Sequence, residues 1–427
     1  MKILVCDDLP DRCEEIAGRI RESTAQEPTE LCGKNLTEQL EQLFKDISTC
    51  MNKPEGYRAA AKYAFDDVDV LVIDNNLAHL QTPGTRLTAE SIAGYIRAFT
   101  NAAYIVSLNK NPDVDFDLRY LVGDYSTRAD LALNDEHLGN VALWSGKPAD
   151  AESGFRPWYW PSLSTVAERR RRQIEFVLEH LDESIVKTMG FDEGAIEFLS
   201  LHAKGALSAI AELNEEDEGE QHFSTLTFRQ VFLAMDRSLP SKNEREALSE
   251  AEMHGNKALR DVIARIVAAD IDLWFRRDIV GPQEPLIDIP HLIVRFPFLL
   301  GNRANNMDEW NKSIMASEAP YGLEERLYDD YLADRKFKHE EWVPSPCFWW
   351  PKLKADEELN DYFLKDKATE WADLAFCEDR SAFLHRTPQD DTSIPLEFPA
   401  EFESSWERRY VSRIEGVKYA PRSRLAM

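Results

Sequence analysis

Short apolar runs that alternate with helix-like segments are the sequence feature that most constrains the fold of this chain. Four such runs are present, at 3–6, 68–73, 102–108 and 140–144. Between the first three runs, apolar residues recur at three- and four-residue spacing over 9–22, 36–50 and 88–99, which predicts amphipathic helices. Apolar strands that alternate with helices are typical of an open, mostly parallel sheet covered on both faces.

The pattern changes near residue 150, where Gly, Pro and aromatic residues replace the strand–helix alternation. All ten tryptophans lie at or after position 144, so the second part of the chain has a different core. We predict an α/β domain over 1–150, a linker over 151–164 and a mostly α-helical domain over 165–427. Within the last of these, the Pro-interrupted apolar segment 281–300 is expected to be buried and extended.

The charge balance limits the partners that the protein is expected to bind. The 427 residues include 50 Lys and Arg against 77 Asp and Glu, which gives a net charge of −27. Both parts are acidic, with 15 basic and 24 acidic residues in 1–148 and 35 basic and 53 acidic residues in 149–427. Neither part has the excess of basic residues that binding to a phosphate backbone requires, so nucleic acid is not an expected partner.

The chain also lacks the sequence signals of membrane and secreted proteins. No apolar run approaches the roughly 18 residues of a membrane-spanning helix. The apolar stretch at the start is too short for a signal peptide. The six cysteines are scattered without a CxxC pair, so neither a disulfide framework nor a metal cluster is expected. We therefore expect a cytoplasmic protein that does not enter a membrane.

Polar residues follow the ends of the predicted strands. Asp7 and Asp8 end the first strand and Asp74 the second. Ser107 lies at the end of the third strand, and Lys147 follows the fourth. Ligands of open α/β sheets bind outside the carboxyl ends of the strands, so these side chains are expected to converge. Clustered carboxylates repel one another unless a cation is bound, and Mg²⁺ with a phosphoryl group meets that requirement.

These segments resemble the receiver domain of two-component response regulators, which has a flavodoxin-like doubly wound parallel sheet. The matching segments are ILVCDD (3–8), VLVIDNN (70–76), YIVSLNK (104–110) and LWSGKP (143–148). The resemblance covers about residues 1–150 and does not extend to 161–427. It implies a bacterial, cytoplasmic phosphoprotein that receives its phosphoryl group from a histidine kinase or another phosphodonor.

The resemblance also assigns roles at the acidic end of the predicted pocket. Asp74 would accept the phosphoryl group through its carboxylate. Asp7 and Asp8 would hold Mg²⁺ together with Asp74. Asn76, two residues after the acceptor, would add its backbone carbonyl to the ligands of the metal.

Three further residues would complete the switch that the resemblance implies. Ser107 would be the hydroxyl that follows the phosphoryl group when it is transferred. Lys147 would bind a phosphoryl oxygen. Trp144, three residues before the lysine, would be the switch aromatic.

Two intervals are longer in this chain than in the receiver family. They separate Asp8 from Asp74 and Ser107 from Lys147. We therefore place insertions at about 24–60 and about 109–138. Lys110 is a competing candidate for the phosphate-binding lysine. Lys147 is preferred because an apolar strand precedes it and a proline follows it.

The sequence supports a main functional hypothesis and two alternatives. In the main hypothesis, phosphorylation of Asp74 switches the C-terminal domain, which then acts through contacts with a protein partner. The chain is alternatively a pseudo-receiver scaffold of a larger assembly, or an effector enzyme whose active site in 165–427 is not recognised. The common catalytic motifs are missing from 165–427, so enzymatic activity stays an open question, as does homodimer formation.

A run of four arginines, Arg169–Arg172, is the segment that most suggests nucleic-acid binding. It lies near the start of a predicted helix in an otherwise acidic chain. Charge runs of this kind usually form a solvated helix face or a contact between domains. We predict one of those two roles for it.

Overall fold

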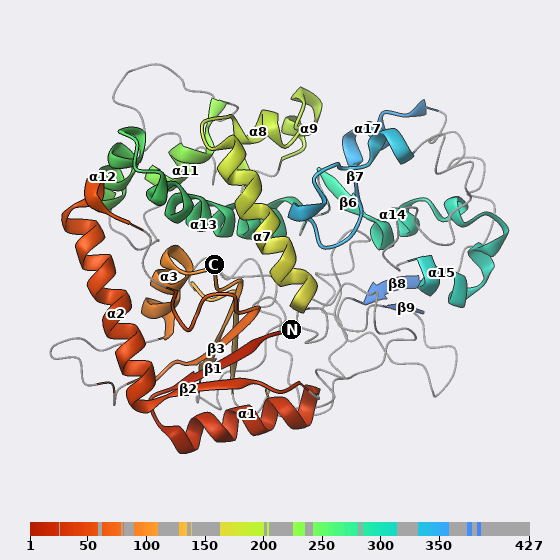
Figure 1. Ribbon diagram of the computed structural model, residues 1–427. Coiled ribbons are helices and arrows are strands. Elements are labelled where there is room, and N and C mark those ends of the chain that lie inside the picture. Colours follow the sequence, from red (N-terminus) through yellow and green to blue (C-terminus); the bar gives the residue numbers. More distant parts are fainter. Residues whose placement is uncertain are drawn as a thin grey trace, which may run out of the picture.

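A five-stranded parallel sheet organises the N-terminal part of the computed structural model (Figure 1). The strands lie in the order β2-β1-β3-β4-β5, and every neighbouring pair is parallel. The predicted α/β class with a parallel sheet is therefore confirmed. The strands are β1 (Ile3–Asp7), β2 (Thr29–Cys32), β3 (Val70–Asp74), β4 (Tyr104–Asn109) and β5 (Leu131–Asn134).

The structure describes part of the chain, and all statements below concern that part. The described residues are 1–24, 26–58, 62–77, 80, 89–109, 128–134, 138, 163–199, 203–204, 225–234, 242–280, 283, 285–313, 332–357, 374–377 and 382–385. The predicted strand at 140–144 lies outside them, as do Trp144, Lys147 and the competing Lys110.

Helices cover both faces of the sheet, as the apolar spacing predicts. On one face, α1 (Pro10–Thr24) packs Cys13, Ile16 and Ile20 against the apolar side chains of the strands. On the other face lie α2 (Gly33–Asn52) and α3 (Ala89–Phe99). Successive strand residues point to opposite faces, so a strand covered on both sides has to be apolar at every position.

Two strands of the sheet lie in segments that the sequence analysis treated as insertions. The segment 24–60 contains β2 and α2, and 109–138 contains β5. β2 is an edge strand with the sequence TELC, and its first two residues are exposed. An edge strand with so few apolar residues has no periodic pattern to reveal it. These segments therefore contribute regular elements of the sheet.

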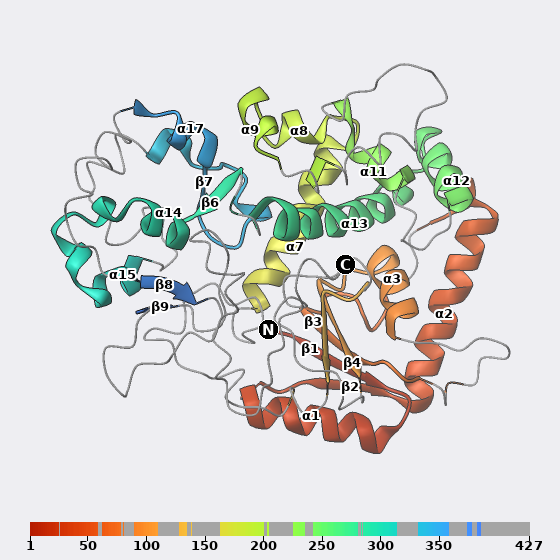
Figure 2. The ribbon, with the colours of Figure 1, turned by 180° about the vertical axis from the view of Figure 1, so that it is seen from behind.

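Most of the described residues after position 162 are helical. The longest helices in this part are α7 (Leu163–His180) and α13 (Lys257–Trp274), which cross one another beside α3 in Figure 2. A π-helical turn, Phe275–Val280, continues α13. The other helices before residue 281 are α8 (Ile185–Thr188), α9 (Glu193–Glu197), α11 (Phe228–Ala234) and α12 (Lys242–Met253).

Short elements make up the rest of the described chain. Two antiparallel pairs, β6 with β7 and β8 with β9, accompany several helical turns. The strands are β6 (Leu286–Asp288), β7 (Cys347–Trp349), β8 (Leu374–Cys377) and β9 (Ala382–His385). The α-helices are α14 (Ile289–Arg295), α15 (Met307–Ser313) and α17 (Trp350–Lys354). The 3₁₀ segments are Pro54–Gly56, Pro297–Asn305, Ala333–Arg335 and Glu340–Trp342.

The described residues of 281–300 are mostly buried, as expected, but most of those after β6 are helical, so the prediction of an extended chain was wrong for them. Asp288 caps α14, because its side chain accepts a hydrogen bond from the backbone N–H of His291. Pro290 lies in the first turn of that helix, where its missing N–H removes no helical hydrogen bond. Proline here marks the start of a helix instead of preventing one.

One hydrophobic core joins the sheet to the helical region. Buried residues of α2, α3, α7 and α13 belong to a single continuous cluster. α7 contacts β3 and β4, α13 contacts α3, and α12 contacts α2. The described segments on either side of the predicted linker are therefore packed together.

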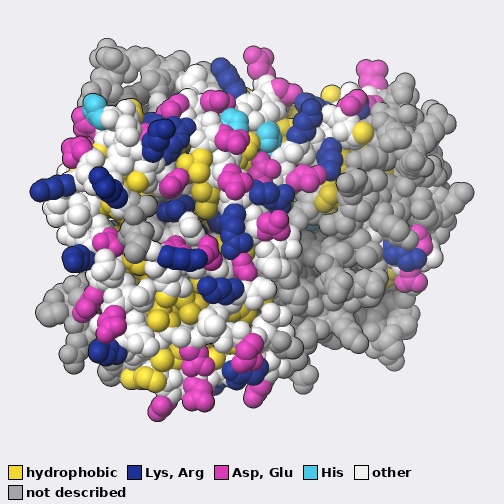
Figure 3. Space-filling model, viewed as in Figure 1, with side chains coloured by type: hydrophobic (Ala, Val, Ile, Leu, Met, Phe, Trp, Pro, Cys, Tyr) yellow, Lys and Arg dark blue, Asp and Glu magenta, His cyan; other side chains and the backbone are white. Residues whose placement is uncertain are grey.

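The exterior of the described part mixes charges of both signs. Figure 3 shows acidic and basic side chains interspersed over the face that it presents. None of the described helices is long and apolar enough to cross a membrane.

Candidate functional site

Three aspartates lie at the carboxyl ends of two neighbouring strands. β1 and β3 are parallel with Cys6 opposite Ile73, so the next residues along the two strands leave the sheet at the same edge. The exposed fractions of Asp7, Asp8 and Asp74 are 1%, 6% and 2%, which means that water reaches these carboxyl groups very little. The structure therefore brings together the acidic residues that the sequence predicts to converge.

Backbone amides hold two of these carboxylates in place. The N–H of Leu9 donates to Asp7 Oδ1 at 2.8 Å, and the N–H of Asn76 donates to Asp74 Oδ2 at 3.0 Å. Both bonds link an aspartate to the residue two positions later, which is the pattern of an Asx turn. The second carboxylate oxygen of Asp7 is buried and accepts no hydrogen bond from the described residues.

The acidic cluster shifts the proton affinity of Asp7. Burial raises the pKa of this carboxyl group to about 7, and the negative charges of Asp74 and Asp8 act in the same direction. The hydrogen bond from the Leu9 amide opposes the shift in part. A buried carboxylate with other carboxylates beside it favours either a proton or a cation.

The structure describes two more of the predicted site residues. Ser107 is buried in β4 and pairs with Ile73 of β3, one position before Asp74. Asn76 is exposed, and its backbone amide donates a hydrogen bond to the Asp74 carboxylate. Both residues therefore lie at the sheet edge where the carboxylates converge.

The strand beside β4 differs from the one predicted to precede the lysine. The place next to β4 is taken by β5, which ends at Asn134. Lys147 was expected to follow a strand at 140–144, and that strand lies outside the described residues together with Lys147 and Trp144. Their predicted roles stay predictions.

The three aspartates carry the ligand type that a hard divalent cation prefers. Their present arrangement, however, is not that of a metal site. Carboxylate and carbonyl oxygens are the ligands that Mg²⁺ prefers. Within the described ranges, however, no group of three or more His, Cys, Asp or Glu side chains is arranged to hold a metal ion. Asp7, Asp8 and Asp74 would have to turn toward a common point before a cation could bind all three.

A second polar cluster lies at the opposite, amino end of the sheet, and the sequence analysis did not identify it as a cluster. Arg170 of α7 pairs with Asp130, which precedes β5, at 2.9 Å and with Asp272 of α13 at 3.2 Å. Arg171 pairs with Asp69, which precedes β3, at 2.6 Å. Two members of the arginine run thus connect α7 to the sheet.

Asp272 is the residue from which this second cluster could have been predicted in the sequence. It is a charged residue at a buried position of α13, whose inward face is otherwise apolar. Charged residues are rarely buried without a partner of opposite sign. The arginine run and this aspartate together indicated a buried ion pair, although nothing in the sequence fixed which arginine takes part.

Comparison with known proteins identifies no family for this chain. No protein-family model matches it, and neither does any curated protein or solved structure. The functional interpretation therefore depends on the residues of the two sheet edges and on their geometry.

Proposed function

We propose that the N-terminal part is a receiver-like phosphoryl switch in which Asp74 accepts the phosphoryl group. The observation that carries this proposal is the burial of Asp7, Asp8 and Asp74 together at the carboxyl ends of β1 and β3. The strand order 2-1-3-4-5 supports it, because flavodoxin-like sheets with this order bind their ligands between β1 and β3.

The proposed chemistry is an in-line displacement at phosphorus. A carboxylate oxygen of Asp74 attacks the phosphorus of the donor, and the bond between phosphorus and the leaving group breaks. The leaving group departs with the electron pair of that bond, and Asp74 becomes an acyl phosphate. The Asn76 amide at 3.0 Å keeps the Asp74 carboxylate oriented for this attack.

Mg²⁺ is the proposed cofactor of the reaction. It would be held by Asp7, Asp8, Asp74 and the backbone carbonyl of Asn76, and when bound it would neutralise charge on the phosphoryl oxygens. The raised pKa of Asp7 supports a cation at this position, because a positive charge would offset the repulsion among the carboxylates. Ser107 and Lys147 are the proposed partners of the transferred group.

A route from the acceptor to the helical region is visible in the contacts of α3. The N–H of Ala89, the first residue of α3, donates to the carbonyl of Asn75, which follows Asp74, at 3.4 Å. α3 in turn contacts α13. A change in the backbone after Asp74 would therefore act on α3 and α13, which supports an output through protein–protein contacts of the helical region.

Phosphoryl labelling tests the proposal. We expect a small phosphodonor with Mg²⁺ to label the wild-type protein and the Asp11→Asn variant, and to leave the Asp74→Asn variant unlabelled. Asp11 is an exposed carboxylate of α1, so its replacement makes the same charge change at a side chain that faces solvent. Equal labelling of all three proteins would contradict the assignment of Asp74.

The arrangement of the three carboxylates favours a second candidate, a pseudo-receiver that keeps the fold without phosphorylation. The observation in its favour is that the described carboxylates do not surround a common point. Beryllofluoride with Mg²⁺ separates the two candidates, because it mimics a bound phosphoryl group without a kinase. A rise in the unfolding temperature that Asp74→Asn abolishes would support the switch, and an unchanged temperature would support the scaffold.

A further inference from the structure

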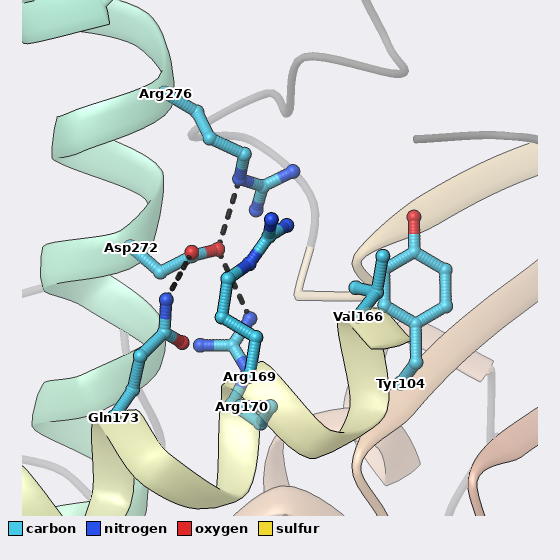
Figure 4. A pocket seen from close by; sticks show the side chains of 7 residues that line it. All are labelled: Tyr104, Val166, Arg169, Arg170, Gln173, Asp272 and Arg276. Atoms are coloured by element: carbon cyan, nitrogen blue, oxygen red, sulfur yellow. Dashed lines mark hydrogen bonds and ion pairs between the residues drawn. The ribbon is translucent and has the colours of Figure 1, made fainter. Parts of the chain in front are cut away.

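A pocket lies at the amino edge of the sheet, where α7, α13 and the start of β4 meet (Figure 4). This edge is opposite to the one that carries the aspartates, because Tyr104 is the first residue of β4. The pocket is lined by Tyr104, Val166, Arg169, Arg170, Gln173, Asp272 and Arg276. Three guanidinium groups thus share the lining with a single carboxylate.

The carboxylate of Asp272 already has three polar partners in the protein. Asp272 Oδ2 lies 3.2 Å from Arg170 Nη2 and 2.9 Å from Arg276 Nε, and Asp272 Oδ1 accepts a hydrogen bond from Gln173 Nε2 at 2.6 Å. Figure 4 shows these three side chains converging on Asp272. Its negative charge is divided between two arginines, so the aspartate does not neutralise the lining.

The carboxylate of Asp130, which lies behind the lining, does not change the charge balance of the pocket. Asp130 pairs with Arg170 at 2.9 Å, but it also pairs with Arg97 of α3 at 2.8 Å. Including this pair gives four guanidinium groups and two carboxylates. Counted over these six residues, the excess of positive charge is two. Asp270, which interacts with Arg97 and Arg170, does not line the pocket.

Arg169 has the weakest set of protein contacts in the lining. Its one hydrogen bond within the described part of the chain is a long one, 3.4 Å from Nη1 to the carbonyl of Val343. Figure 4 shows its guanidinium group beside that of Arg276. Burial lowers the pKa of Arg169, and although Asp272 opposes this effect, the charges of Arg276 and Arg170 add to it. An anion between the two guanidinium groups would relieve that repulsion.

We propose that Arg169 and Arg276 bind a phosphoryl dianion at the mouth of this pocket, either as inorganic phosphate or as the head group of a larger ligand. The free volume of the pocket, about 10 Å³, admits one phosphoryl oxygen. The planar fork of an arginine forms paired hydrogen bonds with phosphate oxygens. A dianion matches the excess of two positive charges. The buried Tyr104 hydroxyl adds a donor at the wall of the pocket, since burial raises its pKa and keeps it protonated.

The net charge of the protein makes this proposal specific. At −27 the molecule as a whole repels anions. Saturable phosphate binding would therefore have to come from a local site. The proposed site is also separate from the acidic edge, where phosphate is not expected to bind without a divalent cation.

Calorimetric titration with inorganic phosphate tests the proposal, using the full chain at constant ionic strength with a chelator of divalent cations. We expect saturable binding to the wild-type protein. Arg169→Gln should weaken it by about tenfold or more, because charge-assisted hydrogen bonds are lost. Arg169→Lys should weaken it less, since the charge remains but the fork does not.

Arg172→Gln is the matched control. It removes the same charge from the same arginine run, but Arg172 is exposed to solvent and does not line the pocket. Its phosphate affinity should equal that of the wild type. Equal weakening by Arg172→Gln and Arg169→Gln, absence of saturable binding to folded wild-type protein, or equally tight binding of chloride would each overturn the proposal.

A second ligand distinguishes the two sources of the phosphoryl group. Tighter binding of phenyl phosphate than of inorganic phosphate would assign the pocket to the head group of a larger ligand. Tighter binding of inorganic phosphate would assign it to the free ion. Both titrations use the same variants, so the contribution of Arg169 is measured for each ligand.

Discussion

Asp7 is the single residue whose surroundings most affect the pH dependence of stability. Its pKa is about 7 in the folded protein, against an ordinary value of 3.8. The folded protein therefore binds more protons at this site than the unfolded chain between these two values, and stability falls as the pH rises from about 4 to about 7. Asp7→Asn should remove this loss and stabilise the protein above pH 7 by up to about 4 kcal/mol, the value of a shift of about three pKa units.

Urea unfolding between pH 5 and pH 8 measures this effect. The gain in unfolding free energy from Asp7→Asn should grow with pH and level off above pH 7. The exposed Asp11→Asn variant should show no such growth, because water screens that carboxylate. A gain that is the same at every pH would show that the pKa of Asp7 is not raised in the folded protein.

Among the structural elements, α7 carries two neighbouring arginines whose ion pairs differ in how deeply they are buried. The Arg170 side chain is 6% exposed and bridges two buried carboxylates, whereas the Arg171 side chain is 43% exposed and pairs with Asp69 alone. Arg170→Gln leaves Asp130 and Asp272 with one arginine partner each, so we expect it to cost about 3 kcal/mol. Arg171→Gln should cost about 0–1 kcal/mol, because its pair is largely solvated.

Chemical denaturation of the two variants measures these costs side by side. Both replacements remove one positive charge from adjacent positions of the same helix, so a general effect of charge would be equal in the two. A loss of equal size would show that the buried network does not stabilise the contact between α7 and the sheet.

The sequence predicts elements where a local pattern exists. The strands β1, β3 and β4 are apolar runs, and α1, α2 and α3 have apolar periodicity. The acidic site follows from the strand ends alone. The short strands β2 and β5 carry no such pattern. A Pro-interrupted apolar run such as 281–300 is compatible with an extended segment and with a helix, so the pattern alone does not distinguish them. There the capping contact of Asp288 with His291 reveals a helix start.

The amino-edge cluster shows why the remainder of the site could not be predicted. Arg170 lies 40 residues from Asp130 and 102 residues from Asp272 along the chain. Pairs at such separations depend on how α7 and α13 pack on the sheet. A sequence pattern reports the type of side chain that an element carries, but it contains no information about the partner across an interface.

The whole molecule is expected to unfold as one unit, because its sheet and helical region share a core. Residues of α2 and α3 are packed in the same cluster as residues of α7 and α13. Tryptophan fluorescence reports on the C-terminal part, since all ten tryptophans lie at or after position 144. Cysteine labelling reports on the sheet, where Cys6, Cys13 and Cys50 are buried.

We expect the two probes to give the same urea midpoint. Labelling is measured in a variant with Cys347→Ala and Cys377→Ala, so that the remaining four cysteines all lie in the N-terminal part. Burial raises the pKa of the Cys13 and Cys50 thiols to about 12, which keeps them unreactive until the sheet opens. Coincident transitions indicate a cooperative unit. Two separate midpoints would instead show that the parts fold independently. Arg170→Gln should lower the urea midpoints reported by both probes equally only if they share one transition.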